Sequence, residues 1–235
     1  RLARQQMAVG DRHPELLAIE DAEHFADLTL RLQDPRHGHV VQLAPVGGRQ
    51  IEFREEAPGQ RFPGLKRIAA RDRAVFGESL VEHFCAQGAR VCFVDIAEDA
   101  SRAVVERVKG RGHSAPHFIN CDLRDIDALR EAIAEAGKCH GPIKVLVNNA
   151  GNDDRHSTES VTVDYWDNRM QVNLRHQFFA AQAVRPQMCD AGGGSIINFG
   201  SITWLVGDPD CPAYVTAKAA VGGLTRALAR ELGPE

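Results

Sequence analysis

From Gly77 to the end of the chain, short apolar runs alternate with longer amphipathic segments, and this alternation restricts the fold more than any other feature. The apolar runs are typical of strands at 90–95, 117–120, 143–148 and 195–199. Strands that alternate with helices are joined by crossovers, which favour a parallel sheet covered by helices on both faces. The sequence therefore predicts an α/β fold with a single-domain, doubly wound parallel sheet.

The amphipathic segments predict helices at 77–87, 100–109, 124–136, 164–188 and 213–231. Gly88 and Gly137 are expected to stop the first and third of them, because glycine accepts the backbone conformation that follows a helix end. Asn173 lies inside the fourth helix, although asparagine is a poor helix former that prefers caps and turns. This position indicates a special role, such as holding a water or a backbone group.

Tyr214 and Lys218 stand four residues apart in the last predicted helix, so they share one face of it. A free phenol has a pKa of about 10, and a neighbouring ammonium lowers it towards a value that suits a base. Ser201 follows the apolar run at 195–199, where its hydroxyl could bind a substrate oxygen. Taken alone, the Tyr-Lys pair is more typical of two ordinary helix-surface residues than of a catalytic pair.

Polar residues also follow two of the other predicted strands. Asp95 ends the strand at 90–95, and such a carboxylate accepts hydrogen bonds from the ribose hydroxyls of NAD while repelling a 2′-phosphate. The run Asn148-Asn149-Ala150-Gly151 closes the strand at 143–148 with a tight turn.

Together these segments resemble the short-chain dehydrogenase/reductases, whose fold is a single Rossmann-like α/β domain, and the resemblance covers roughly residues 77 to 235. The family's four catalytic residues match Asn173, Ser201, Tyr214 and Lys218. The resemblance implies that the cofactor is held by Asp95, Ile96, Asp122, Leu123, Asn149, Ala150 and Gly151, together with Tyr214 and Lys218.

The run Asn152-Asp153-Asp154-Arg155-His156 narrows the resemblance to bacterial NAD-dependent aldose 1-dehydrogenases of the D-xylose type. An ordinary solvated polar loop is the alternative interpretation. The expected sugar contacts are Asn152, Asp154, Ser201, Trp204 and Tyr214. Trp204 is equally compatible with simple packing.

The resemblance implies an oxidation of a cyclic aldose at C1 to the aldonolactone, with NAD as cofactor. In it Tyr214 takes the proton of the anomeric hydroxyl, and Lys218 lowers the pKa of that phenol and holds the nicotinamide ribose. Ser201 orients the substrate oxygen, and Asn173 holds a water that links Lys218 to solvent.

The expected phosphate loop departs from the family's pattern T-G-x-x-x-G-x-G. Two of its glycines are replaced by Arg71 and Val75, and the stretch 67–73, where the first strand should end, is charged throughout. A buried central strand does not hold such charges without partners. One interpretation is a shifted reading frame, because the codons for 70–77, read one base later, can encode Leu-Val-Thr-Gly-Arg-Ser-Ser-Gly.

Residues 1–64 match nothing in the family and stay unassigned, so the predicted Rossmann-like domain is 65–235. An extra domain, a flexible extension and a non-native reading frame remain open for 1–64.

The chain ends at Glu235, before the family's sixth and seventh strands, so we expect an incomplete domain. Two rival readings follow: a non-catalytic or impaired Rossmann-like fragment, and a dehydrogenase acting on another secondary alcohol or ketone.

Bulk composition excludes several kinds of partner. The net charge of −4 argues against a nucleic acid or an anionic membrane, and no apolar run approaches the ~18 residues of a membrane span. Six scattered cysteines and no leader segment are typical of a cytoplasmic protein with reduced thiols. The histidines show no metal-ligand spacing, so we expect no metal.

The resemblance implies a homo-oligomer, a dimer or tetramer, that packs through the helices at 164–188 and 213–231.

Overall fold

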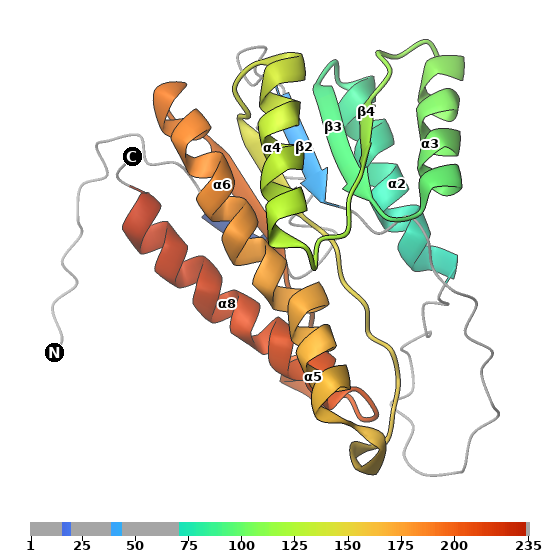
Figure 1. Ribbon diagram of the computed structural model, residues 1–235, viewed down its shortest axis with the longest axis vertical. Helices are drawn as coiled ribbons and strands as arrows, with labels where there is room; N and C mark the ends of the chain where they lie inside the picture. The colour runs from blue at the N-terminus through green and yellow to red at the C-terminus, as the bar shows by residue number, and fades with distance from the viewer. Residues whose placement is uncertain (1–15, 20–38, 44–70, 234–235) are drawn as a thin grey trace, which may run out of the picture.

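A computed structural model describes residues 16–19, 39–43 and 71–233. In that part of the chain, parallel strands form one six-stranded sheet in the order β1-β6-β5-β2-β3-β4 (Figure 1). The strands are β1 (Leu16–Ile19), β2 (His39–Leu43), β3 (Arg90–Asp95), β4 (His117–Asn120), β5 (Val145–Asn148) and β6 (Ser195–Phe199). The predicted α/β fold with a parallel sheet is confirmed.

Helices connect the strands and cover both faces of the sheet. They are α2 (Arg71–Ala86), α3 (Glu98–Gly110), α4 (Ile126–His140), α5 (Val163–Met170), α6 (His176–Asp190), α7 (Thr203–Val206) and α8 (Pro212–Leu232). A 3-10 turn η1 (Thr158–Ser160) precedes α5, and a π-helical segment η2 (Gln171–Arg175) joins α5 to α6. In Figure 1, α4 and α6 cross in front of the sheet.

Two apolar cores lie on opposite faces of the sheet, as the period of two in a strand requires. In β3, Val91 and Phe93 pack with α2 and α3, whereas Cys92 and Val94 pack with α4 and α6. All four are buried. This two-sided burial explains why the strands are continuous apolar runs.

The central strand of the sheet comes from the region that the sequence left unassigned. β2 pairs with β3 on one side and with β5 on the other, and β1 adds an edge beyond β6. The expectation that the first strand ends within 67–73 is wrong, because α2 begins at Arg71. A strand paired on both sides needs a run such as His39–Leu43, whereas the consecutive charges of Arg71, Asp72 and Arg73 are compatible with a helix.

Several helix limits differ from the prediction, and the helix predicted at 164–188 is divided into α5, η2 and α6. α2 begins at Arg71 rather than at Gly77, and α4 runs through Gly137 to His140, ending at Gly141 with φ 88°. A Cβ at Gly137 would collide with the side-chain amide of Gln187, so this glycine permits a close approach of α4 to α6 rather than a helix stop.

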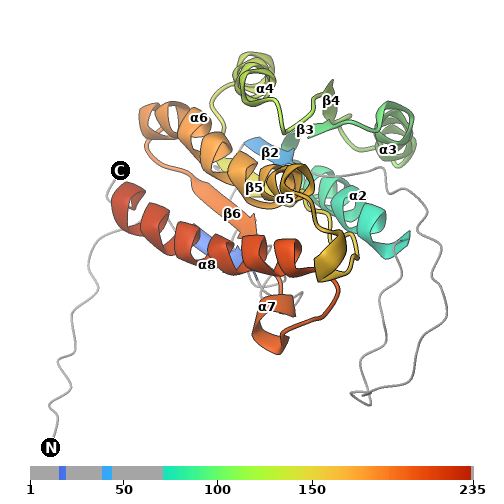
Figure 2. The ribbon, with the colours of Figure 1, turned by 60° about the horizontal axis from the view of Figure 1, so that its bottom comes forward.

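The order of the strands reverses between β2 and β5, and in open α/β sheets such a reversal is where ligands bind at the carboxyl ends of the strands. The segments that follow β3, β5 and β6 all begin at this edge. α5 lies beside the N-terminal part of α8 in both views of the ribbon, close to the same edge (Figures 1 and 2). The fold therefore brings the predicted site segments together at the carboxyl ends of the parallel strands.

Candidate active site

The π-helical segment η2 buries Asn173 completely. Its Oδ1 accepts a hydrogen bond from the backbone N–H of Asn152 at 2.7 Å, and its Nδ2 donates to the carbonyls of Asn152 and Arg169, each at 3.0 Å. A π-helical turn breaks the regular helical hydrogen-bond pattern, and such turns are frequent at functional sites. Asn173 thus holds the chain that follows β5 against the long helix.

Lys218 is a buried cation on α8, 3% exposed. Its Nζ donates to the backbone carbonyl of Phe199 at 2.7 Å, and burial lowers the pKa of this ammonium to about 8. A Cβ at Gly151 would lie 3.3 Å from Nζ and 3.2 Å from Oδ1 of Asn173. A glycine is therefore needed here to let the loop after β5 approach both side chains.

Tyr214 lies one helical turn before Lys218, and the Lys218 Nζ is 5.8 Å from the centre of the Tyr214 ring. Ser201 follows β6, two residues after the carbonyl that Lys218 binds. The Ser201 hydroxyl lies 2.9 Å from Oγ1 of Thr203 and accepts a hydrogen bond from the Thr203 N–H at 3.2 Å. The structure thus brings Asn173, Gly151, Lys218 and Tyr214 together, with Ser201 on the adjoining turn.

A buried polar chain behind this group ties α8 to the sheet. Asn148 Nδ2 donates to Asn198 Oδ1 at 2.8 Å, and Asn198 Nδ2 donates to Thr225 Oγ1 at 3.0 Å. Thr225 in turn donates to the Val221 carbonyl at 2.8 Å. All three side chains are buried, so these bonds fix how α8, and with it Lys218, sits on β5 and β6.

Sequence reasoning missed a contact between the loop after β5 and the loop before α8. Arg155 forms an ion pair with Asp208 at 2.7 Å and donates to the Pro209 carbonyl at 2.7 Å. The backbone N–H of His156 donates to the carbonyl of Asp210 at 2.6 Å, and Asp210 has a left-handed φ of 64°. Nothing in either loop signals a partner more than fifty positions away, since both look like ordinary polar turns.

The predicted sugar contacts come from three segments: Asn152 and Asp154 lie in the loop after β5, Ser201 and Trp204 follow β6, and Tyr214 lies on α8. The Oδ1 of Asn152 accepts a hydrogen bond from the Asp154 N–H at 2.8 Å, so this amide oxygen shapes the turn. Trp204, on α7, is 38% exposed, and Ile202 and Leu205 beside it are also exposed. The segment that follows Ser201 therefore exposes apolar side chains, while the loop after β5 is polar.

Residues 73–235 of the chain match the sequence pattern of the short chain dehydrogenase family. This chain belongs to the short-chain dehydrogenase family. It is 50% identical over 186 residues to a Rhizobium meliloti protein named probable galactose dehydrogenase, covering 76% of this chain and 71% of the relative. It is also 50% identical over 177 residues to D-xylose 1-dehydrogenase of Caulobacter vibrioides, covering 74% and 69%.

Solved structures of other short-chain dehydrogenases share the fold. A short chain dehydrogenase from Mycobacterium smegmatis aligns with a TM-score of 0.66 at 22% identity, covering 83% of this chain and 72% of that one. A variant of actinorhodin polyketide ketoreductase with NADPH aligns with a TM-score of 0.66 at 22% identity, covering 84% and 66%. As a member of this family, the protein is an oxidoreductase that uses a nicotinamide cofactor.

The predicted cofactor residues of this short-chain dehydrogenase lie at the ends of β3, β4 and β5. Asp95 is buried, and its Oδ1 accepts from the Ala97 N–H at 2.8 Å, whereas Ile96 is exposed. Asp122 forms an ion pair with Arg124 at 2.6 Å, and this hydrogen-bonded guanidinium holds the pKa of the Asp122 carboxyl below its usual value.

The other predicted cofactor residues also follow the ends of these strands. Leu123 packs against the apolar core, Ala150 is buried, and Asn149 is half-buried after β5. Of the expected phosphate-loop positions, Arg71 and Val75 lie in α2, and residues 44–70, which precede this helix, are outside the described part of the chain.

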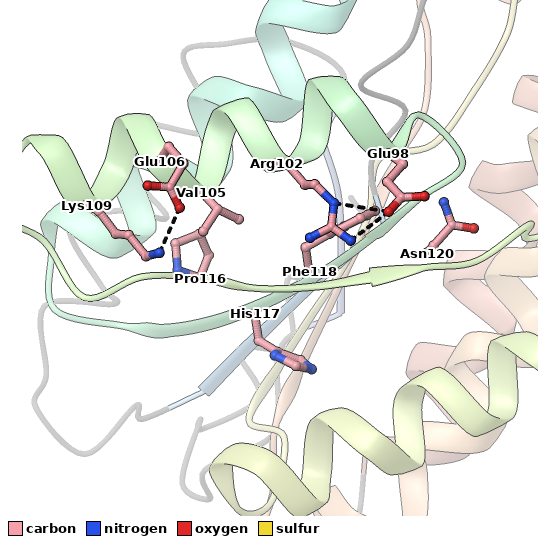
Figure 3. A pocket seen from close by; sticks show the side chains of 9 residues that line it. All are labelled: Glu98, Arg102, Val105, Glu106, Lys109, Pro116, His117, Phe118 and Asn120. Atoms are coloured by element: carbon pink, nitrogen blue, oxygen red, sulfur yellow. Dashed lines mark hydrogen bonds and ion pairs between the residues drawn. The ribbon is translucent and has the colours of Figure 1, made fainter.

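A separate groove of about 460 Å³ runs between α3 and β4 (Figure 3). Glu98 and Arg102 form an ion pair of 2.6 Å along it, and Phe118 lines it from the strand. None of the predicted site residues lines this groove, so it is separate from the group of residues around Lys218.

Among the described residues, no helix is long and apolar enough to cross a membrane.

Proposed function

We propose that this short-chain dehydrogenase oxidises an aldose, D-xylose or a similar sugar, at C1 with NAD⁺. The observation that carries the proposal is the 50% identity to two proteins named as sugar dehydrogenases, galactose dehydrogenase and D-xylose 1-dehydrogenase. The arrangement of Asn173, Tyr214 and Lys218 supports it, because such a group of residues can accept the proton that the oxidation of a hydroxyl releases.

The proposed proton transfer begins at Tyr214, which takes the proton of the anomeric hydroxyl. Lys218 carries its charge below a pH of about 8, so at neutral pH the ammonium favours the phenolate of the tyrosine. Ser201 orients the sugar oxygen, and Asn173 fixes the loop after β5 that faces the same space. The nicotinamide, when bound, accepts the hydride, and an aldonolactone is the product.

The residues at the strand ends fit a dinucleotide. The absence of a Cβ at Gly151 leaves room beside Lys218, and a buried carboxylate at Asp95 suits ribose hydroxyls while disfavouring a 2′-phosphate. We therefore propose NAD⁺ rather than NADP⁺. Asp122, Leu123, Asn149, Ala150 and Gly151 complete the proposed cofactor contacts, with Ile96 after the carboxylate.

For the sugar we propose contacts with Asn152, Asp154 and Trp204, beside Ser201 and Tyr214. Amide and carboxylate groups bind hydroxyls, and an indole face covers the C–H surface of a pyranose. The polar loop after β5 and the exposed indole of Trp204 on α7 support these two kinds of contact.

We also propose that the protein is a cytoplasmic homo-oligomer that packs through α5–α6 and α8, with no nucleic-acid or membrane partner. α8 exposes the small residues Ala219, Ala220 and Gly223, and α6 exposes Phe178. Small residues let a second helix approach closely. Light scattering on the intact chain and on Ala220→Arg tests this proposal: two monomers would contradict it, and an oligomer lost in the variant would support it.

The functional test uses two measurements on the purified chain. Calorimetry with NAD⁺ and NADP⁺ reports cofactor binding, and NADH absorbance reports turnover of D-xylose, L-arabinose and D-galactose against a panel of secondary alcohols. We expect NAD-selective binding and turnover of an aldose, lost in Tyr214→Phe. Binding with turnover of secondary alcohols alone would overturn the sugar assignment. Absence of binding would favour the impaired Rossmann-like fragment.

A further inference from the structure

Three side chains that the dehydrogenase site does not use meet at the outer edge of the sheet. His117 begins β4, the edge strand, and Glu135 and Cys139 lie four residues apart on α4, so these two share one helix face. Figure 3 shows the His117 side chain on the side of β4 opposite to α3. His117 thus lines the groove along α3, while its imidazole ring points to the other side of the strand.

The ligand atoms of these residues lie within 4.8 Å of one another. His117 Nε2 is 2.8 Å from Glu135 Oε1 and 3.8 Å from Cys139 Sγ. Around a tetrahedral zinc ion with bonds of roughly 2.0–2.3 Å, neighbouring ligand atoms stand about 3.3–3.8 Å apart. The sulfur and nitrogen already have this separation, and the Glu135 side chain, which is half exposed, has room to move back.

We propose that His117, Glu135 and Cys139 bind a Zn²⁺ ion. An imidazole nitrogen, a carboxylate oxygen and a thiolate are the three ligand types that zinc takes, whereas magnesium and calcium prefer oxygen alone. Glu135 and Cys139 are exposed, so the ion can reach the site and a water can complete its coordination.

The surroundings of the cluster also favour one thiolate rather than two. Cys92 is the β3 partner of His117 in the strand register and is buried. Its sulfur is not among the ligand atoms that gather in the cluster, so the proposed site carries the two negative charges of Glu135 and a metal-bound Cys139.

An ion at this position joins the edge strand β4 to the last turns of α4. Without it, His117 and Glu135 form an ordinary surface contact, which adds little stability in water. Zinc that binds the folded chain and not the unfolded one raises the melting temperature by mass action. The expected role is thus a structural clip at the open edge of the sheet.

The test uses the full chain, reduced and stripped of metal with a chelator. Zn²⁺ is titrated by calorimetry, and Co²⁺ is followed by its thiolate-to-metal charge-transfer absorption. We expect one equivalent bound, a charge-transfer band, and a melting temperature that rises with Zn²⁺. Cys139→Ser should abolish the band, and both Cys139→Ser and His117→Gln should weaken Zn²⁺ binding by roughly 10-fold or more.

Two matched controls lie outside the cluster. Cys189→Ser removes another exposed thiol, and Glu131→Gln removes a carboxylate one turn earlier on α4. Both should bind Zn²⁺ like the parent chain. No saturable binding, or equal binding by the parent chain and Cys139→Ser, would overturn the proposal, the second result placing the ion elsewhere. Circular dichroism of the metal-free variants checks that each one folds.

Discussion

At the scale of single residues, Lys218 combines a proposed catalytic role with a cost to the stability of the fold. Its ammonium is buried, and its hydrogen-bond acceptor is a neutral carbonyl rather than a carboxylate. Burial lowers its pKa to about 8, against about 10.4 in the unfolded chain. Between these values the unfolded state binds more protons, so the folded state gains stability as the pH rises.

We therefore expect Lys218→Met to lose activity by about 10²-fold or more while keeping its fold. At pH 7 the variant escapes a charge-burial cost on the order of 3 kcal/mol, which offsets the lost hydrogen bond to Phe199. Its stability relative to the parent chain should then decline as the pH rises from 8 to 10. Calorimetric melting across this range, with Lys109→Met as an exposed control, checks the trend, and a constant difference would contradict it.

At the scale of elements, the site depends on two connections between segments far apart in the chain. The ion pair of Arg155 and Asp208 links the loop after β5 to the loop before α8, and the chain Asn148-Asn198-Thr225 anchors α8 to the sheet. The first connection is at the surface, where an ion pair adds little stability. The second is buried, where an unpaired polar group is costly.

Arg155→Met should therefore change activity more than stability. We expect the catalytic efficiency to fall by roughly 10-fold or more as the two loops separate, because small misplacements of catalytic groups are costly, with at most about 1 kcal/mol lost from the unfolding free energy. Steady-state kinetics and urea unfolding measure the two effects. Arg130→Met, which breaks an exposed ion pair with Asp127, is the control. A stability loss without an activity loss would show that Arg155 is structural only.

Thr225→Val should instead change stability directly. The substitution removes the acceptor of the Asn198 amide inside the core, which costs about 1–3 kcal/mol of unfolding free energy. Thr216→Val, at an exposed position of the same helix, should be close to neutral. Urea unfolding of both variants gives the comparison, and equal losses would assign the effect to helix propensity.

At the scale of the whole molecule, the sheet depends on β2 occupying the place between β3 and β5. This strand comes from the region without a family match, and it stands where the strand order reverses. The predicted cofactor residues at the ends of β3 and β5 keep their places only if this position is filled. The integrity of the dinucleotide site is thus tied to residues 39–43.

Val41→Pro tests this dependence. Proline removes a backbone N–H from a strand that pairs on both sides, and we expect a loss of about 3 kcal/mol or more, or of cooperative unfolding. Leu17→Pro, in the edge strand β1, should cost less, because that strand pairs with β6 alone. Thermal unfolding followed by circular dichroism compares them; equal melting of Val41→Pro and the parent chain would contradict the central place of β2.

The sequence by itself determined the elements between residues 90 and 233, because their periodicity and apolar content are local properties. β3, β4 and β6 have the predicted limits, and Asn173, Tyr214 and Lys218 could be singled out from spacing and helix propensity. Boundaries set by packing have no local signal. Gly137 has the sequence pattern of a helix stop, but it lies inside α4, where the side chain of Gln187 packs against it.

Only the tertiary structure decided which distant segments meet. The entry of β2 into the sheet, the pairing of Arg155 with Asp208, and the meeting of His117 with Glu135 and Cys139 leave no local trace. Each joins residues tens of positions apart, and their proximity follows from the strand order and from which face of the sheet each helix covers. Such contacts depend on the whole arrangement of the chain, so a local pattern predicts the parts of this dehydrogenase but not their contacts.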